Sequence, residues 1–171
     1  SLAEGVARVL DVSGPTYTVS TACSSSANAL ASARRLLAIN VCDAVIVGGV
    51  DTLCQLTVQG FASLESLSDG YCNPFSANRD GINIGEAGAI FILSREPGPV
   101  ALLGVGASSD AHHISAPEPS GRGAIEAMRM ALAQGQRDAS EVDYLNLHGT
   151  ATRQNDAMES IAVHSLFGAN L

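Results

Sequence analysis

Runs of nearly continuous apolar residues alternate along this chain with segments whose apolar residues recur at helical spacing. The clearest run is residues 43–50 (Asp-Ala-Val-Ile-Val-Gly-Gly-Val), which stops at paired glycines, as a buried strand does. Residues 24–39 contain no Gly or Pro and place Ala and Leu side chains near one face, which predicts a largely buried helix. Because sheets with apolar strands are covered by helices, this alternation favours a layered α/β fold.

The same patterns predict the remaining elements. Further helices are expected at residues 2–10, 53–67 and 125–133. Further strands are expected at residues 16–20, 88–93, 100–105 and 142–147, the last leading directly into His148.

Composition excludes several classes of protein. The chain has 171 residues, of which 46% are hydrophobic and 15% charged, so it is not a disordered segment. Its net charge is -8 and all nine basic residues are arginines without a basic run, which argues against a nucleic-acid partner. No apolar stretch reaches the roughly 20 residues of a membrane helix. The four cysteines match neither a zinc pattern nor CxxC pairs, so no metal is expected and a reducing cytoplasm is the expected location.

Cys23 lies between the strand predicted at 16–20 and the helix predicted at 24–39. The first turn of a helix presents unpaired N–H groups and a partial positive charge, which stabilise a thiolate and the oxyanion formed when it attacks an acyl carbonyl. The small residues around Cys23 leave room for a bulky thioester. Most free cysteines, however, are small buried hydrophobic residues, and position alone leaves that interpretation open.

His148 ends a predicted strand and precedes Gly149-Thr150-Ala151-Thr152. Ligands of α/β sheets collect at the carboxyl ends of strands, although a lone histidine there is more often structural. Cys23 and His148 together favour a nucleophile that works with a histidine.

Several motifs occur in order along nearly the whole chain. Thr21-Ala22-Cys23-Ser24-Ser25-Ser26 is similar to the nucleophile motif of the β-ketoacyl synthases. Residues 147–152 (Leu-His-Gly-Thr-Ala-Thr), with Asp156 and Glu159, resemble the first histidine motif of that family. Residues 47–51, 73–81, 85–88, 108–111 and 116–117 are similar to segments that the family carries between these two motifs.

This resemblance implies a thiolase-like fold, layered α-β-α-β-α, with two similar halves and mixed, mostly parallel sheets. Residues 1–105 would be the C-terminal part of the N-terminal ketosynthase half, and residues 106–171 the start of the C-terminal half. The family's opening strands, second histidine motif, lysine and Gly-Phe-Gly loop have no counterpart here, and the connection at residues 94–99 is shorter than usual. The chain begins with Ser1, and we expect it to be an excerpt that would not complete the condensation alone.

The resemblance also implies a function, which is a decarboxylative Claisen condensation in fatty acid or polyketide synthesis. Cys23 would accept an acyl group from an acyl carrier protein, with its own N–H as one oxyanion donor. The neutral ring of His148 would donate its Nε2–H to the carbonyl of the malonyl thioester. Thr150 and Thr152 would bind the phosphopantetheine arm of the carrier protein. No cofactor bound to the enzyme itself is expected.

Supporting roles follow for two acidic residues. Glu159 would pair with a lysine further along, and Asp156 would support the same loop, although a charge pair near a helix N-terminus is nearly as good an interpretation. Arg79 and Asp80 are expected to fix a loop by ion pairing. The other cysteines, Cys42, Cys54 and Cys72, are expected to be packing residues.

Two other classes of function stay open. The first is a non-catalytic partner subunit that shapes a heterodimer, and the presence of both Cys23 and His148 speaks against it. The family's chain-length-factor relatives lack the cysteine and its decarboxylase-only relatives carry Gln there, so Cys23 supports an active condensing enzyme. A thiolase or chalcone-synthase relative is more remote, because the His-Gly-Thr-Ala-Thr stretch fits the carrier-protein-dependent group better. A homodimer is expected, with a heterodimer as the alternative, because the family pairs the strand before the nucleophile with its mate across a two-fold axis.

Overall fold

The computed structural model describes residues 1–169, and Asn170 and Leu171, the end of the second predicted domain, lie outside the described residues. The chain divides into two compact units. The first unit combines residues 1–51 with residues 87–101, and the second combines residues 52–86 with the chain from residue 102 onward.

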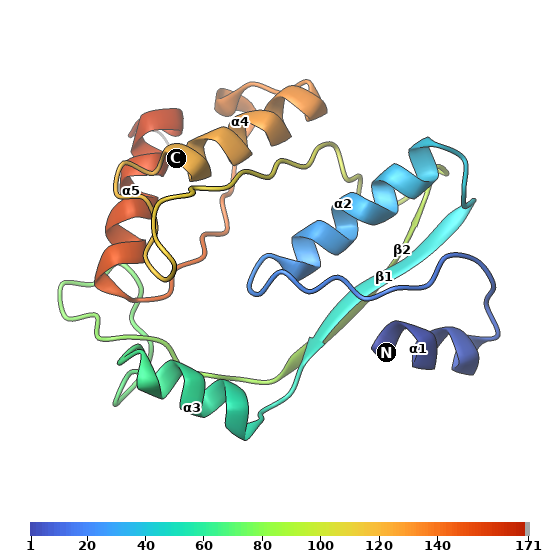
Figure 1. The fold of residues 1–171 in the computed structure, drawn as a ribbon. Coiled ribbons are helices and arrows are strands. Elements are labelled where there is room, and N and C mark those ends of the chain that lie inside the picture. The colour runs from blue at the N-terminus through green and yellow to red at the C-terminus, as the bar shows by residue number, and fades with distance from the viewer. Residues whose placement is uncertain (170–171) are drawn as a thin grey trace. The chain divides into compact units, whose positions relative to one another are not determined.

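The first unit is a helix packed on a strand pair. It contains α1 (Leu2–Leu10), α2 (Ser25–Ala38), β1 (Ala44–Asp51) and β2 (Ala87–Ser94). The two strands are antiparallel, with Ala44 opposite Ser94 and Asp51 opposite Ala87. The helix α2 lies along this pair (Figure 1) and buries Ala31, Ala33 and Leu37, while β1 contributes the buried Val47.

Two glycines of β1 make close approaches, Gly48 to β2 and Gly49 to α2. A Cβ on Gly48 would lie 2.2 Å from the carbonyl oxygen of Ala89, and a Cβ on Gly49 would lie 2.5 Å from Oγ of Ser26. At the other end of α2, the Arg95 guanidinium donates to the carbonyl of Leu37 at 2.8 Å and to the carboxylate of Asp43 at 3.0 Å. Both ends of α2 are thereby fixed to the strand pair.

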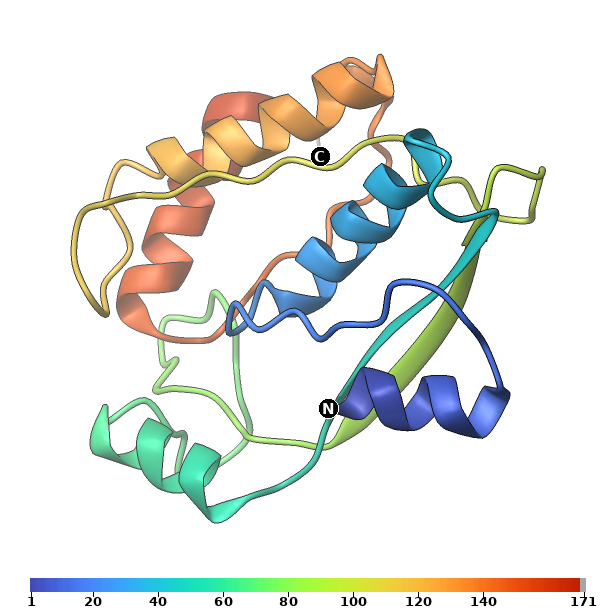
Figure 2. The same ribbon diagram turned by 45° about the vertical axis from the view of Figure 1, so that its right-hand side comes forward.

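The second unit is built around two packed helices. It contains α3 (Gln55–Ser63), α4 (Arg122–Gly135), the short 3-10 helix η1 (Ala139–Glu141) and α5 (Arg153–Phe167). Residues 102–106 run beside α4 in both ribbon views (Figure 2). Glycine makes this possible, since a Cβ on Gly104 or Gly106 would lie 2.1 or 1.9 Å from a backbone oxygen of α4.

Most of the predicted elements are confirmed with small changes in their bounds. The helices expected at 2–10, 24–39 and 125–133 are α1, α2 and α4, and the strands expected at 43–50 and 88–93 are β1 and β2. The helix expected at 53–67 ends earlier, at Ser63, because Glu65 adopts a left-handed conformation with φ 51°.

Three predicted strands are not strands within residues 1–169. Residues 16–20, 100–105 and 142–147 join no ladder of the described chain. Their β-branched and apolar residues favour an extended backbone, but a strand also requires a neighbour that accepts and donates its backbone hydrogen bonds. For the same reason β1, expected to be buried, contributes only Val47 to the core of the described residues.

None of the helices within residues 1–169 is long and apolar enough to cross a membrane.

Candidate active site

Cys23 lies on a tight turn directly before α2 in the first unit. The residue before it, Ala22, has φ 52°, a left-handed conformation that costs an alanine roughly 1 to 2 kcal/mol. The amide of Ser25 donates to the carbonyl of Ala22 at 3.0 Å, which closes the turn as the helix begins. Cys23 is exposed in the described part of the chain.

The hydroxyl groups around Cys23 are bonded within the turn. Oγ of Ser25 accepts from the amide of Thr21 at 2.8 Å and donates to the carbonyl of Ala22 at 2.6 Å. Oγ of Ser24 donates to the carbonyl of Thr21 at 2.8 Å. These side chains therefore hold the turn itself, and Cys23 is the exposed residue that the turn presents.

The other five predicted site residues, His148, Thr150, Thr152, Asp156 and Glu159, all belong to the second unit. Three of them, His148, Asp156 and Glu159, take part in short contacts between the loop at 148–152 and the first two turns of α5. Cys23 belongs to the first unit, and its pairing with the imidazole of His148 stays a prediction.

Glu159 holds the backbone at His148. Its Oε1 accepts from the amide of His148 at 2.6 Å, and its Oε2 accepts from the amide of Gly149 at 2.9 Å. Hydrogen bonds to a carboxylate are among the stronger ones in proteins. Both oxygens of Glu159 thus fix the peptide that carries the exposed His148, and the predicted ion pair with a lysine stays a prediction.

Asp156 is the buried anchor of the same loop, with 1% of its surface exposed. Its carboxylate accepts from the amide of Ala151 at 3.1 Å and from the amide of Phe75 at 2.7 Å. Nε of Arg79 lies 3.6 Å from Oδ2 of Asp156. The carboxylate therefore ties the loop at 73–79 to the loop that carries His148.

Sequence reasoning assigned the wrong partner to Arg79. It was expected to pair with Asp80, whereas its guanidinium approaches Asp156 and donates to the carbonyls of Ser76 at 2.9 Å and Arg153 at 3.3 Å. Asp80 instead accepts from the hydroxyl of Ser68 at 2.6 Å. Neighbours in sequence suggested the first pairing, and only the fold brings residues 79 and 156 together.

Thr150 and Thr152 are joined through their hydroxyl oxygens, which lie 2.8 Å apart. One hydroxyl uses its proton in this bond, so the O–H of the other is available to a ligand. Gly149, between His148 and Thr150, has φ 54°, and the nearest atoms to a Cβ there belong to Pro74 and Phe75, at 3.4 and 3.6 Å. A side chain at residue 149 would therefore be strained by the positive φ, while its Cβ would make ordinary van der Waals contacts with the loop that Asp156 anchors.

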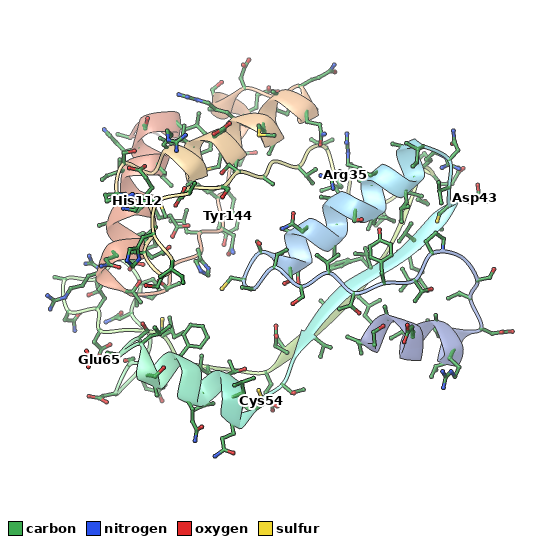
Figure 3. All side chains as sticks on the ribbon, in the orientation of Figure 1. Arg35, Asp43, Cys54, Glu65, His112 and Tyr144 are labelled. Carbon is green, nitrogen blue, oxygen red and sulfur yellow. The ribbon has the colours of Figure 1, made fainter. Side chains whose placement is uncertain are left out.

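The structure shows a second exposed cysteine, Cys54, although a packing role was expected for it. Figure 3 labels it at the start of α3, where its Sγ lies 3.0 Å from Oγ1 of Thr57. This hydrogen bond is the largest cause that lowers the pKa of the Cys54 thiol below its ordinary value, and backbone amides of the first turn add to it. Cys-x-x-Thr at a helix start is a signal that sequence reasoning had available and did not use.

Within residues 1–169, no three His, Cys, Asp or Glu side chains gather in an arrangement that holds a metal ion.

Two family descriptions match the chain in succession. Residues 2–98 match the β-ketoacyl synthase N-terminal domain, and residues 100–171 match the β-ketoacyl synthase C-terminal domain.

Named relatives agree with this assignment. The chain is 37% identical to the 3-oxoacyl-(acyl-carrier-protein) synthase 2 of Rhizobium meliloti, over 91% of this chain and 40% of that protein. It is 36% identical to the nodulation protein E of Rhizobium meliloti, over 95% of this chain and 42% of that protein. The chain therefore spans about two fifths of the length of these curated relatives.

Solved structures show the same fold. The chain superposes on one chain of a solved complex with a TM-score of 0.96 at 54% identity, over 98% of this chain and 42% of that one. The complex is that of the ketosynthase ApeO with its chain length factor ApeC, from Xenorhabdus doucetiae. A β-ketoacyl synthase from Burkholderia phymatum superposes with a TM-score of 0.86 at 29% identity, over 96% of this chain and 43% of that one. The expected thiolase-like α/β fold is confirmed, and the chain belongs to the β-ketoacyl synthase family.

Proposed function

We propose that this chain supplies the nucleophile and the first histidine of a β-ketoacyl-acyl-carrier-protein synthase. The observation that carries the proposal is the turn at Cys23, which presents an exposed thiol at the start of α2 in a chain of this family. The reaction class is acyl transfer followed by decarboxylative condensation, in fatty acid or polyketide synthesis.

The first half-reaction is transfer of the acyl group. The thiolate of Cys23 attacks the carbonyl of an acyl thioester on the phosphopantetheine of an acyl carrier protein. A new thioester forms at Sγ, the old carbon–sulfur bond breaks, and the carrier thiol leaves with a proton. The positive end of α2 stabilises the oxyanion that forms between these two events.

The second half-reaction is the condensation. Malonyl carrier protein loses carbon dioxide, and the resulting enolate attacks the carbonyl of the Cys23 thioester, which releases the thiolate. His148, fixed at its amide by Glu159, donates a hydrogen bond to the oxygen on which the enolate charge develops. The free O–H of the Thr150–Thr152 pair supports binding of the phosphopantetheine arm.

No bound cofactor is needed in this scheme, because the carrier protein brings both acyl groups. The proposed partners are therefore an acyl carrier protein and a second ketosynthase subunit, either identical or a chain length factor. The cytoplasmic location expected from the cysteines stays a prediction.

Mass spectrometry of the intact protein tests the first half-reaction. After incubation with an acyl carrier thioester, we expect the mass of one acyl group on the peptide that contains Cys23, and no gain in Cys23→Ser. Cys42→Ser serves as the matched control and should acylate normally. Absence of acylation at saturating donor would contradict the enzyme and favour a non-catalytic partner subunit.

A second variant tests the other half-reaction. His148→Ala should acylate at Cys23 at the normal rate but release no carbon dioxide from malonyl carrier protein. Condensation by His148→Ala at the rate of the unmodified protein would remove His148 from the mechanism.

A further inference from the structure

One amide group spans the turn that carries Cys23. Nδ2 of Asn28 lies 3.1 Å from Oγ1 of Thr21 and 3.2 Å from Oγ of Ser24. Thr21 lies two residues before Cys23 and Ser24 lies one residue after it, so the two acceptors stand on either side of the nucleophile.

The chemistry of an amide matches this arrangement. An NH₂ group has two protons and can donate to two acceptors at once, whereas the hydroxyl oxygens retain lone pairs that accept. Ser24 uses its own proton on the carbonyl of Thr21 at 2.8 Å, which leaves its oxygen free to accept from Asn28. Each hydroxyl thus has a distinct role in one connected network.

The turn requires such a restraint. Ala22 has φ 52°, a conformation that an alanine leaves unless the surrounding structure holds it. Asn28 lies in the first turns of α2 and is half-buried, so its position is set by the helix and by the strand pair on which the helix packs. A bond from Asn28 to Thr21 therefore couples the residues before the turn to the helix after it.

We propose that Asn28 is a positioning residue for Cys23, acting through Thr21 and Ser24 to hold the left-handed turn. The inference rests on the proposed role of Cys23 as the nucleophile. The side-chain hydrogen bonds of Asn28 go to Thr21 and Ser24 and not to the Cys23 thiol. Its loss lets the turn relax, and the thiolate then leaves the position from which it attacks a carbonyl.

A double-mutant cycle on the intact protein tests this. Asn28→Leu removes the donor at nearly constant volume, and Thr21→Val removes one acceptor at constant shape. We expect each to lower the rate of Cys23 acylation about tenfold, because small displacements of a reacting atom are costly. The double variant should be slower by less than the product of the two single effects, because both variants remove the bond between Asn28 and Thr21, although each also removes a bond to Ser24.

Two measurements separate positioning from simple structural loss. The rate at which iodoacetamide alkylates Cys23, mapped by peptide, should fall in parallel with acylation, while KM for the acyl carrier thioester stays unchanged. Ser32→Ala is the matched control, because it removes a side-chain bond of α2 to Tyr17, 2.5 Å long, without touching the turn. It should lower the unfolding midpoint and leave both rates at Cys23 unchanged. Where Asn28→Leu fails to fold, Asn28→Asp keeps the shape and removes the two N–H donors.

The outcomes distinguish the two proposals. Normal acylation and alkylation in Asn28→Leu, or rate losses that simply add in the double variant, overturn the role of Asn28. Failure of the unmodified protein to acylate at Cys23 overturns the proposed function. In that case the alkylation cycle still decides whether Asn28 holds the thiol, because iodoacetamide needs no carrier protein.

Discussion

Glu159 fixes the backbone at His148, because its two carboxylate oxygens accept hydrogen bonds from the amides of His148 and Gly149. Glu159→Gln replaces one accepting oxygen with an NH₂ group that cannot accept, so one of the two amides loses its partner. We expect the free energy of unfolding to fall by about 1 to 3 kcal/mol. We also expect condensation to slow by about tenfold through the displaced imidazole.

The two half-reactions, measured separately in Glu159→Gln, provide the control. Acylation of Cys23 in Glu159→Gln should proceed at the normal rate, because the turn at Cys23 belongs to the other unit. Carbon dioxide release from malonyl carrier protein should carry the whole loss. Equal slowing of both steps would show that Glu159 acts on general stability rather than on His148.

Cys54 provides a pH-dependent prediction at the same scale. Its pKa is lowered, first by the hydrogen bond with Thr57, so the thiolate forms at a lower pH than that of an ordinary cysteine. As the pH is raised, alkylation of Cys54 by iodoacetamide should therefore begin at a lower pH in the folded protein than in the protein unfolded in urea. Thr57→Val should move the pH profile of the folded protein to higher pH, toward that of the unfolded protein. Identical profiles in the native and unfolded protein would contradict the role of Thr57.

Among the elements, the contact between residues 102–106 and α4 depends on glycine. A Cβ on Gly106 would lie 1.9 Å from the carbonyl oxygen of Ala127, so Gly106→Ala must displace the segment from the helix. We expect a loss of about 1 to 3 kcal/mol in the free energy of unfolding. The measurement is the urea midpoint of the intact protein.

Gly60→Ala is the matched substitution, and its expected effect on the free energy of unfolding has the opposite sign. Gly60 lies inside α3 with no heavy atom within 4 Å of a Cβ, so alanine adds no clash there. It should stabilise the helix by about 0.5 to 1 kcal/mol, because alanine loses less backbone entropy than glycine. Equal changes in the free energy of unfolding for Gly106→Ala and Gly60→Ala would contradict this prediction. They would show that the backbone preference of alanine over glycine sets both changes and that the close approach of Gly106 to α4 has no effect.

Some of the elements could be predicted from the sequence and others could not. Helices α1, α2 and α4 follow from local periodicity, and β1 and β2 follow from apolar runs, so their positions could be predicted from nearby residues. The antiparallel register of β1 and β2, and the contact between Arg79 and Asp156, join residues far apart in sequence and could not. Residues 16–20 carry a strand pattern without a partner in the described chain, because pairing depends on neighbours that the local pattern does not specify.

On the scale of the whole molecule, the first unit presents apolar surface on both sides of β2. Ile90, Phe91 and Ile92 are 66%, 56% and 74% exposed, although successive side chains of a strand point to opposite faces. Monomeric soluble proteins rarely expose contiguous apolar patches of this kind. Residues 88–93 were predicted to be a strand, and their nearly continuous apolar run is typical of strands covered on both faces. Both observations fit a strand that other parts of the assembly cover.

Dimerisation is the whole-molecule prediction. Residues 16–20 join no ladder of the described chain, so their backbone is available for pairing. The hydroxyl of Tyr17 lies 2.5 Å from that of Ser32, which ties this side of the segment to α2. We predict that the intact protein is a two-fold dimer that pairs this segment with its mate, or with the equivalent segment of a second ketosynthase-like chain. Size-exclusion chromatography with light scattering gives the mass directly, and a monomer at micromolar concentration would contradict the prediction.

A proline substitution tests whether this segment forms the interface. Thr18→Pro removes a backbone N–H and cannot continue a ladder. A two-fold interface contains the segment twice, so a homodimer would lose two hydrogen bonds, worth about 2 kcal/mol together, and its dissociation constant would rise roughly thirtyfold. Thr18→Val keeps the N–H and the branched shape, and it should dimerise normally. In a heterodimer only one bond is lost, so the rise would be about fivefold. The size of the effect therefore distinguishes two identical subunits from two different ones. Only alternate N–H groups of a strand face one neighbour, so an unchanged constant in both Thr18→Pro and Val19→Pro would place the interface elsewhere.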